Sequence, residues 1–130
     1  MQLTPEILQR LAHNEGVHHG KYAAERRKHQ RLWMGRKAVI RRIGAPHAEP
    51  IAVVVRDLSA AGVGLVHSQV MPVGSTFSLT MSGGAQDTQP YVTVECQTVR
   101  CDRASGGGAY VVGAQFVRIL SPAPREPAVV

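Results

Sequence analysis

The sequence predicts an all-β fold, a six-stranded antiparallel β-barrel preceded by one short helix. After residue 36 the chain divides into short runs rich in β-branched residues, separated by turn residues, with no helical period between them. The 130 residues, 44% of them hydrophobic, are enough for one domain with one core. In a domain of this size we expect the sheet to close into a barrel, because closure leaves no exposed strand edge.

Residues 1–20 predict a helix followed by a connector. Thr4 is a suitable N-cap, and Pro5 fits the first helical position. We expect the helix to end by Gly16. A helix this short is not stable alone, so it must dock on the barrel or on a partner.

The barrel domain is expected over residues 21–120. Its clearest strand runs from Thr76 to Met81, where polar and apolar residues alternate strictly. The predicted strands are 37–43, 51–55, 63–67, 76–81, 91–96 and 110–117. Residues 121–130 contain three prolines and no periodicity, which predicts a disordered tail.

The positive charge is concentrated in the first third of the chain. Residues 1–42 hold ten Lys/Arg and three Glu, a net charge of +7, whereas residues 43–130 hold five Arg and six Asp/Glu, a net −1. Such a block attracts polyanions, namely nucleic acid, nucleotides or anionic lipid. A solvated basic surface without a ligand is the alternative. Aromatic residues make up only 5%, so stacking surfaces for single-stranded nucleic acid are scarce.

Several classes of protein are disfavoured by the sequence. No apolar run approaches the ~20 residues of a membrane helix, and the N-terminus lacks a signal-peptide layout. We therefore expect a cytoplasmic protein in which Cys96 and Cys101 are reduced. The histidines and cysteines lack metal-ligand spacing, so we expect neither a metal nor a cofactor. Ser59 lacks a hydrolase context and the glycine-rich loops lack a P-loop ending, so we expect no enzyme.

Two short motifs carry the functional prediction. Residues 26–31, Arg-Arg-Lys-His-Gln-Arg, separate Arg27 from Arg31 by three residues. Guanidinium forks suit phosphate and the O6/N7 edge of guanine. Residues 57–62, Asp-Leu-Ser-Ala-Ala-Gly, place a carboxylate, a hydroxyl and a glycine after an apolar run. We predict that the two stretches form one site for an anionic purine ligand, with the arginines either on one helix face or in a closing loop.

The order of these motifs resembles the two-part signature of the PilZ domain over about residues 25–120. The residues that carry the resemblance are Arg27-x-x-x-Arg31, then Asp57-x-Ser59-x-x-Gly62, with Gly113-x-x-Phe116 near the last strand. The resemblance implies a six-stranded barrel that acts as a receptor for the bacterial second messenger cyclic di-GMP and passes the signal to a protein partner. It also implies that the arginine motif lies in a flexible segment that folds over the ligand, and that the second motif lies on the barrel surface. The basic spacer 28–30 leaves open one ligand or a stacked pair.

The ligand residues expected from the resemblance are Arg26, Arg27, Arg31, Asp57, Ser59 and Gly62. Arginine can fork onto a phosphate or a guanine, or stack on a base, while Asp57 accepts from guanine N1–H and N2–H₂. Ser59 adds a hydroxyl contact and Gly62 permits a close approach. In the competing interpretation, the second motif only shapes a turn. Arg26 would then contribute only general positive charge. Trp33 either stacks on a base or joins the core.

Two other functions compete with the receptor hypothesis. A small basic barrel that binds RNA or DNA accounts for the charge, but not for Asp57, because a carboxylate repels a phosphate backbone. A protein-interaction adaptor without a ligand is the third class. Under the receptor hypothesis, the arginine segment orders near Asp57, the N-terminal helix moves, and an unidentified protein partner responds.

Overall fold

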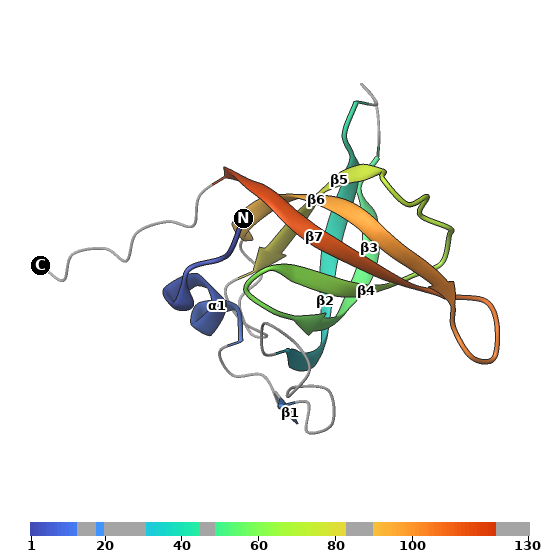
Figure 1. Cartoon of the computed structure of the whole chain (residues 1–130), viewed down its shortest axis with the longest axis horizontal. Helices are drawn as coiled ribbons and strands as arrows, with labels where there is room; N and C mark the ends of the chain where they lie inside the picture. The colour runs from blue at the N-terminus through green and yellow to red at the C-terminus, as the bar shows by residue number, and fades with distance from the viewer. Residues whose placement is uncertain (13–17, 20–30, 45–48, 83–89, 122–130) are drawn as a thin grey trace, which may run out of the picture.

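A computed structural model describes residues 1–12, 18–19, 31–44, 49–82 and 90–121 (Figure 1). A helix, α1 (Pro5–Leu11), precedes the strands. The strands are β1 (His18–His19), β2 (Leu32–Arg42), β3 (Ile51–Leu58), β4 (Gly62–His67), β5 (Thr76–Ser82), β6 (Pro90–Arg103) and β7 (Tyr110–Ser121). This architecture confirms the predicted barrel with its short N-terminal helix.

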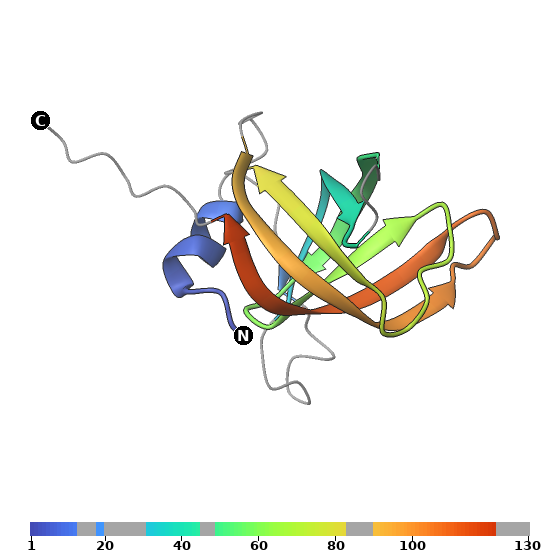
Figure 2. The same cartoon turned by 90° about the horizontal axis from the view of Figure 1, so that it is seen from above.

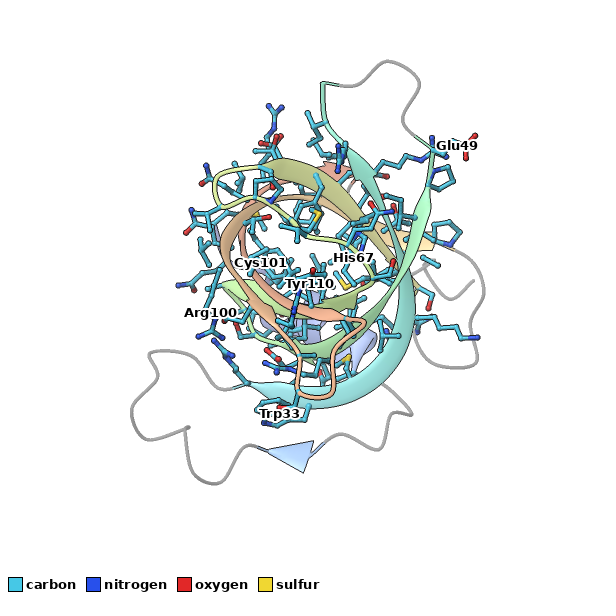
Figure 3. The ribbon with its side chains drawn as sticks, turned by 90° about the vertical axis from the view of Figure 1, so that its right-hand side faces the viewer. Trp33, Glu49, His67, Arg100, Cys101 and Tyr110 are labelled. Carbon is cyan, nitrogen blue, oxygen red and sulfur yellow. The ribbon has the colours of Figure 1, made fainter. Side chains whose placement is uncertain are left out.

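The six long strands close into a ring. They follow the order β2-β3-β4-β7-β6-β5, all neighbours are antiparallel, and β5 pairs back onto β2. Figure 3 looks along this ring. The two-residue strand β1 pairs with the start of β2, in a segment for which only a connector was expected. Strands β3, β4, β7 and β6 lie side by side on one wall of the ring.

The alternation of side chains explains both the core and the errors in the predicted strand lengths. In β5, Phe77, Leu79 and Met81 point inward and are fully buried, as the pattern predicted. Strand β6 continues well beyond the predicted end at residue 96. Its next inward position is Thr98, which is buried and bonded to the Ser75 hydroxyl at 3.1 Å. A polar residue in the core breaks the apolar pattern, so the sequence did not indicate the rest of the strand.

The N-terminal helix begins as predicted and ends earlier. The Thr4 hydroxyl accepts the Ile7 N–H at 3.2 Å, which confirms the N-cap. The helix ends at Leu11, before Gly16, which lies outside the described residues. Leu11 is fully buried in the core cluster and completes the face that docks on the barrel.

The helix packs at one end of the barrel (Figure 2). Leu3, just before it, is buried in the barrel core, and its N–H donates to the Ala60 carbonyl at 2.7 Å. The expected docking is therefore onto the barrel itself. Strand β7 includes Ser121, the first residue of the predicted tail, and the remainder of that tail lies outside the described residues. The helix described here has seven residues, too few to cross a membrane.

Candidate functional site

A pocket of about 480 Å³ opens on the outer wall of the barrel over β3, β4, β7 and β6. This volume lies within the range of about 300–1,000 Å³ that is usual for small-molecule sites. The side chains and glycines that shape it are Arg31, Arg56, Asp57, Ser59, Gly62, Gly64, Val99, Arg100, Gly113 and Gln115. It brings together four of the six predicted ligand residues. The other two, Arg26 and Arg27, lie outside the described residues.

The most buried charge of the pocket is the carboxylate of Asp57. Its Oδ1 lies 3.5 Å from Arg31 Nη1, and its Oδ2 accepts from Arg56 Nε at 2.9 Å. The Asp57 side chain is 3% exposed, whereas Arg31 and Arg56 are 31% and 33% exposed. We refer to these three residues as the Asp57 cluster. The second motif thus lies on the outer wall, as the resemblance implied, but the carboxylate is covered by guanidinium groups.

A β-bulge aims Asp57 into the pocket. Val55 pairs with Leu65, but the next pair is Asp57 with Gly64, so Arg56 is an extra residue in β3. One extra residue reverses which face the following side chains occupy, and bulges of this kind often lie next to functional sites. Asp57 therefore points outward and Leu58 points into the core, where it is fully buried. The predicted strand 51–55 ended at this bulge.

Gly64 leaves the space that the Asp57 carboxylate occupies. A Cβ at this position would overlap the carboxylate, with Asp57 Cγ only 2.8 Å away. Asp57 therefore lies over bare backbone of β4, and any larger residue at position 64 would displace it. The sequence analysis missed Gly64, because its importance depends on the pairing of β3 with β4.

The turn between β3 and β4 explains Ser59 and Gly62 structurally. The Ser59 hydroxyl accepts the N–H groups of Ala61 at 3.3 Å and of Gly62 at 3.1 Å. A Cβ on Gly62 would overlap the Ala114 carbonyl oxygen of β7, so a glycine is needed for close approach of two strands. Both residues also line the pocket. Turn chemistry and a contact with ligand are thus compatible at these two positions.

Trp33 neither joins the core nor stacks on another ring in the described part of the chain. It is half-buried at the start of β2, and the Arg56 guanidinium lies 5.1 Å from its ring centroid. Such a cation–π contact favours a fixed guanidinium. Arg56 is consequently held by an indole and by a carboxylate.

The far side of the pocket contains residues that the sequence analysis did not select. Arg100 lies on β6 and Gln115 on β7, where the Gln115 amide donates to Gln97 Oε1 at 3.0 Å. Gln115 lies within the predicted strand 110–117, whereas Arg100 lies beyond the predicted end of strand 91–96, and nothing in the local sequence marks either as a ligand residue. Arg56 had one signal, its position beside Asp57.

The described residues offer little support for catalysis or metal binding. No group of three or more His, Cys, Asp or Glu among them could hold a metal ion. Both cysteines are free thiols, and burial, with a smaller effect of Glu95, raises the pKa of Cys96 to about 12. A thiol with this pKa is a poor nucleophile at neutral pH.

Comparisons with known proteins agree with this architecture. The family model of the PilZ domain matches residues 25–126. Among solved structures, the inhibitor of motility MotI/DgrA of Bacillus subtilis aligns with a TM-score of 0.58 and 16% sequence identity. The alignment covers 72% of this chain and 43% of that chain, so the match spans less than half of the neighbour's length and concerns the fold. The search of curated proteins found no match.

Proposed function

Because the chain belongs to the PilZ domain family, we propose that it is a receptor for cyclic di-GMP. The ligand would bind in the pocket on the outer wall of the barrel, over β3, β4, β7 and β6. The observation that carries this proposal is the Asp57 cluster, in which one buried carboxylate and two guanidiniums face the same pocket. The role is binding and relay rather than catalysis.

The chemistry of the ligand fits these groups. Cyclic di-GMP offers two phosphates and two guanines. Asp57 can accept from guanine N1–H and N2–H₂, but both of its oxygens have guanidinium partners here. Arg31, at 3.5 Å, is the looser partner, whereas Arg56 donates at 2.9 Å and also contacts Trp33. We therefore expect guanine to replace Arg31 on Asp57, after which the Arg31 fork binds a phosphate or a base.

The arginine segment would close over the bound ligand. Arg31 immediately precedes β2 and lines the pocket, so residues 26–30 are attached at the edge of the site. Arg26 and Arg27 would then add positive charge on the side of the ligand that faces away from the barrel. This ordering step couples ligand binding to the position of the chain that leads back to α1.

Calorimetry with cyclic di-GMP tests the receptor proposal on wild type and on the variant Arg27→Ala/Arg31→Ala. Each lost charge-assisted hydrogen bond weakens binding by roughly 10- to 100-fold, so the double variant should show almost no heat of binding. The matched control is Arg41→Ala/Arg118→Ala, which removes the same charge from exposed positions outside the pocket. Equal affinity of wild type and the Arg27/Arg31 variant would exclude these arginines as ligands.

The relay to a partner is proposed to pass through α1. The turn that holds Ser59 and Gly62 at the pocket also accepts the Leu3 N–H on the Ala60 carbonyl. A ligand that shifts this turn would therefore alter the docking of the N-terminal segment. Amide hydrogen exchange should change over residues 3–12 on addition of cyclic di-GMP. Unchanged exchange there at saturating ligand would reject the relay and leave the receptor proposal intact.

A further inference from the structure

We propose that Arg100 binds the second phosphate of the ligand and makes the site selective for a cyclic dinucleotide over a mononucleotide. This inference deepens the proposed function and rests on it. It follows from the place of Arg100 in the sheet, from its weak attachment to its neighbour, and from the two glycines that lie between it and Asp57 in the sheet.

A single row of paired residues crosses the pocket. Asp57 pairs with Gly64, Gly64 pairs with Gly113, and Gly113 pairs with Arg100. Directly paired residues present their side chains on the same face of a sheet. We call these four residues the cross-strand row. It places a carboxylate at one end, a guanidinium at the other, and two glycines between them.

A second β-bulge brings Arg100 into this row. Thr98 pairs with Ala114, and the next pair is Arg100 with Gly113, so Val99 is the extra residue of β6. Without the bulge, Val99 would stand opposite Gly113. The bulge at Arg56 acts in the same way on Asp57. Both charged ends of the cross-strand row thus owe their position to an inserted residue.

The two glycines let the side chains at the ends of the row lie over the sheet between them. A Cβ at Gly64 would overlap the Asp57 carboxylate, and a Cβ at Gly113 would lie 3.7 Å from Arg100 Cβ and 4.0 Å from its Nε. The backbones of Asp57 and Arg100 are three strand spacings apart, about 14 Å along a flat sheet, and their charged groups are closer because both side chains lie over the glycines. A mononucleotide whose guanine lies on Asp57 and whose single phosphate lies on Arg31 has no second phosphate for Arg100. A cyclic dinucleotide has a second phosphate on the opposite side of its ring.

Arg100 is available to such a phosphate. Its side chain is 57% exposed, and its Nε lies 3.2 Å from Asp102 Oδ2, which is 64% exposed. Exposed ion pairs contribute little to stability, so the guanidinium can exchange Asp102 for a phosphate at low cost. Phosphate offers the bidentate geometry that a guanidinium prefers. Arg56, held by Asp57 and Trp33, lacks this freedom.

The test compares wild type, Arg100→Ala and Arg118→Ala, using cyclic di-GMP and 5′-GMP as ligands. Arg118 is the matched control because it is 69% exposed, pairs with Glu95 across β6 and β7, and lies outside the pocket. Calorimetry measures the affinity for cyclic di-GMP, and an NMR shift titration at millimolar concentration measures the binding of GMP. We expect Arg100→Ala to weaken the binding of cyclic di-GMP by roughly 10- to 100-fold. GMP binding, or its absence, should be the same in all three proteins.

Each other outcome counts against the inference. Unchanged affinity of Arg100→Ala for cyclic di-GMP would overturn it, and so would an equal loss for both ligands or an equal loss in Arg118→Ala. In those cases wild type still binds, and the receptor proposal stands. Failure of wild type itself to bind cyclic di-GMP would overturn the receptor proposal and this inference together.

Discussion

Asp57 and His67 lie on the same β3–β4 hairpin, and both are almost fully buried, at 2% and 3% exposure. Asp57 faces two guanidinium groups. His67 Nδ1 accepts the Gln69 N–H at 2.9 Å, and burial, with a smaller effect of the Arg42 charge, lowers its pKa. Figure 3 shows His67 toward the inside of the ring, with Arg100 and Trp33 on its outside.

The difference between their partners indicates which buried polar group can bind a ligand. The partners of Asp57 are side chains about one-third exposed, and a donor of a ligand can replace the looser one, Arg31. The partner of His67 is a backbone amide only two residues away, which a ligand does not replace. Burial alone therefore does not identify a binding residue. The mobility and charge of its partners do.

Removing the Asp57 carboxylate is the strongest test of this difference between Asp57 and His67. Asp57→Ala leaves Arg31 and Arg56 without their counter-charge, and we expect a loss of about 1–3 kcal/mol in the free energy of unfolding. Cyclic di-GMP binding should fall below detection, since the guanine acceptor is gone. Chemical denaturation and calorimetry measure the two effects.

The control for Asp57→Ala is Glu95→Ala, which removes the carboxylate bonded to Arg118 at 2.9 Å. Because Arg118 is largely exposed, this loss should be below about 1 kcal/mol. An equal loss of stability in the two variants would show that burial of the Asp57 cluster has no special effect.

A methyl group on Gly64 should have the next largest effect. Gly64→Ala places its Cβ where the Asp57 carboxylate lies, so the carboxylate must move. We expect a loss of about 1–3 kcal/mol in stability, as for other overpacked sites, and weaker binding of cyclic di-GMP. Gly35→Ala is the control, because a Cβ there meets nothing within 4 Å. Wild-type affinity in Gly64→Ala would contradict the role given to Gly64 in placing the Asp57 carboxylate.

The smallest effect concerns the pH dependence of His67. Its pKa in the unfolded chain is near 6.5, and the folded value is lower. The unfolded chain therefore binds more protons between these values, and stability falls as the pH is lowered through that window. A protonated Nδ1 can also no longer accept the hydrogen bond from the Gln69 N–H.

Melting temperatures of wild type and His67→Asn between pH 7 and pH 5 measure this effect. Asn keeps an acceptor near the position of Nδ1 and does not titrate, so its profile should be flatter than that of wild type. Parallel profiles for the two proteins would assign the acid sensitivity to other groups.

The parts of the fold that depend on local chemistry were predictable from the sequence. The N-cap at Thr4 and the alternation in β5 are set by neighbours in the chain. The end of α1 depends on where Leu11 meets the barrel, which the sequence does not show. Strand pairing is likewise not local, so the sequence indicated Asp57 but not its place over Gly64.

The two bulges limited the prediction of the site. Each interrupts the alternation by one residue, Arg56 in β3 and Val99 in β6. The predicted strands ended at or before these points, and the residues beyond them could not be assigned to a face. Arg100 was missed for this reason, whereas Asp57 was found because a family motif contains it.

Trp33, the single tryptophan of the chain, pairs with Asp57 and so extends the cross-strand row by one strand. The Arg56 guanidinium lies over its indole ring. Indole fluorescence responds to a nearby charge, and no second indole contributes to the signal. The protein therefore carries a built-in optical reporter at the edge of its own pocket. Occupancy that shifts Arg56 would be readable as a change in emission, without any attached dye.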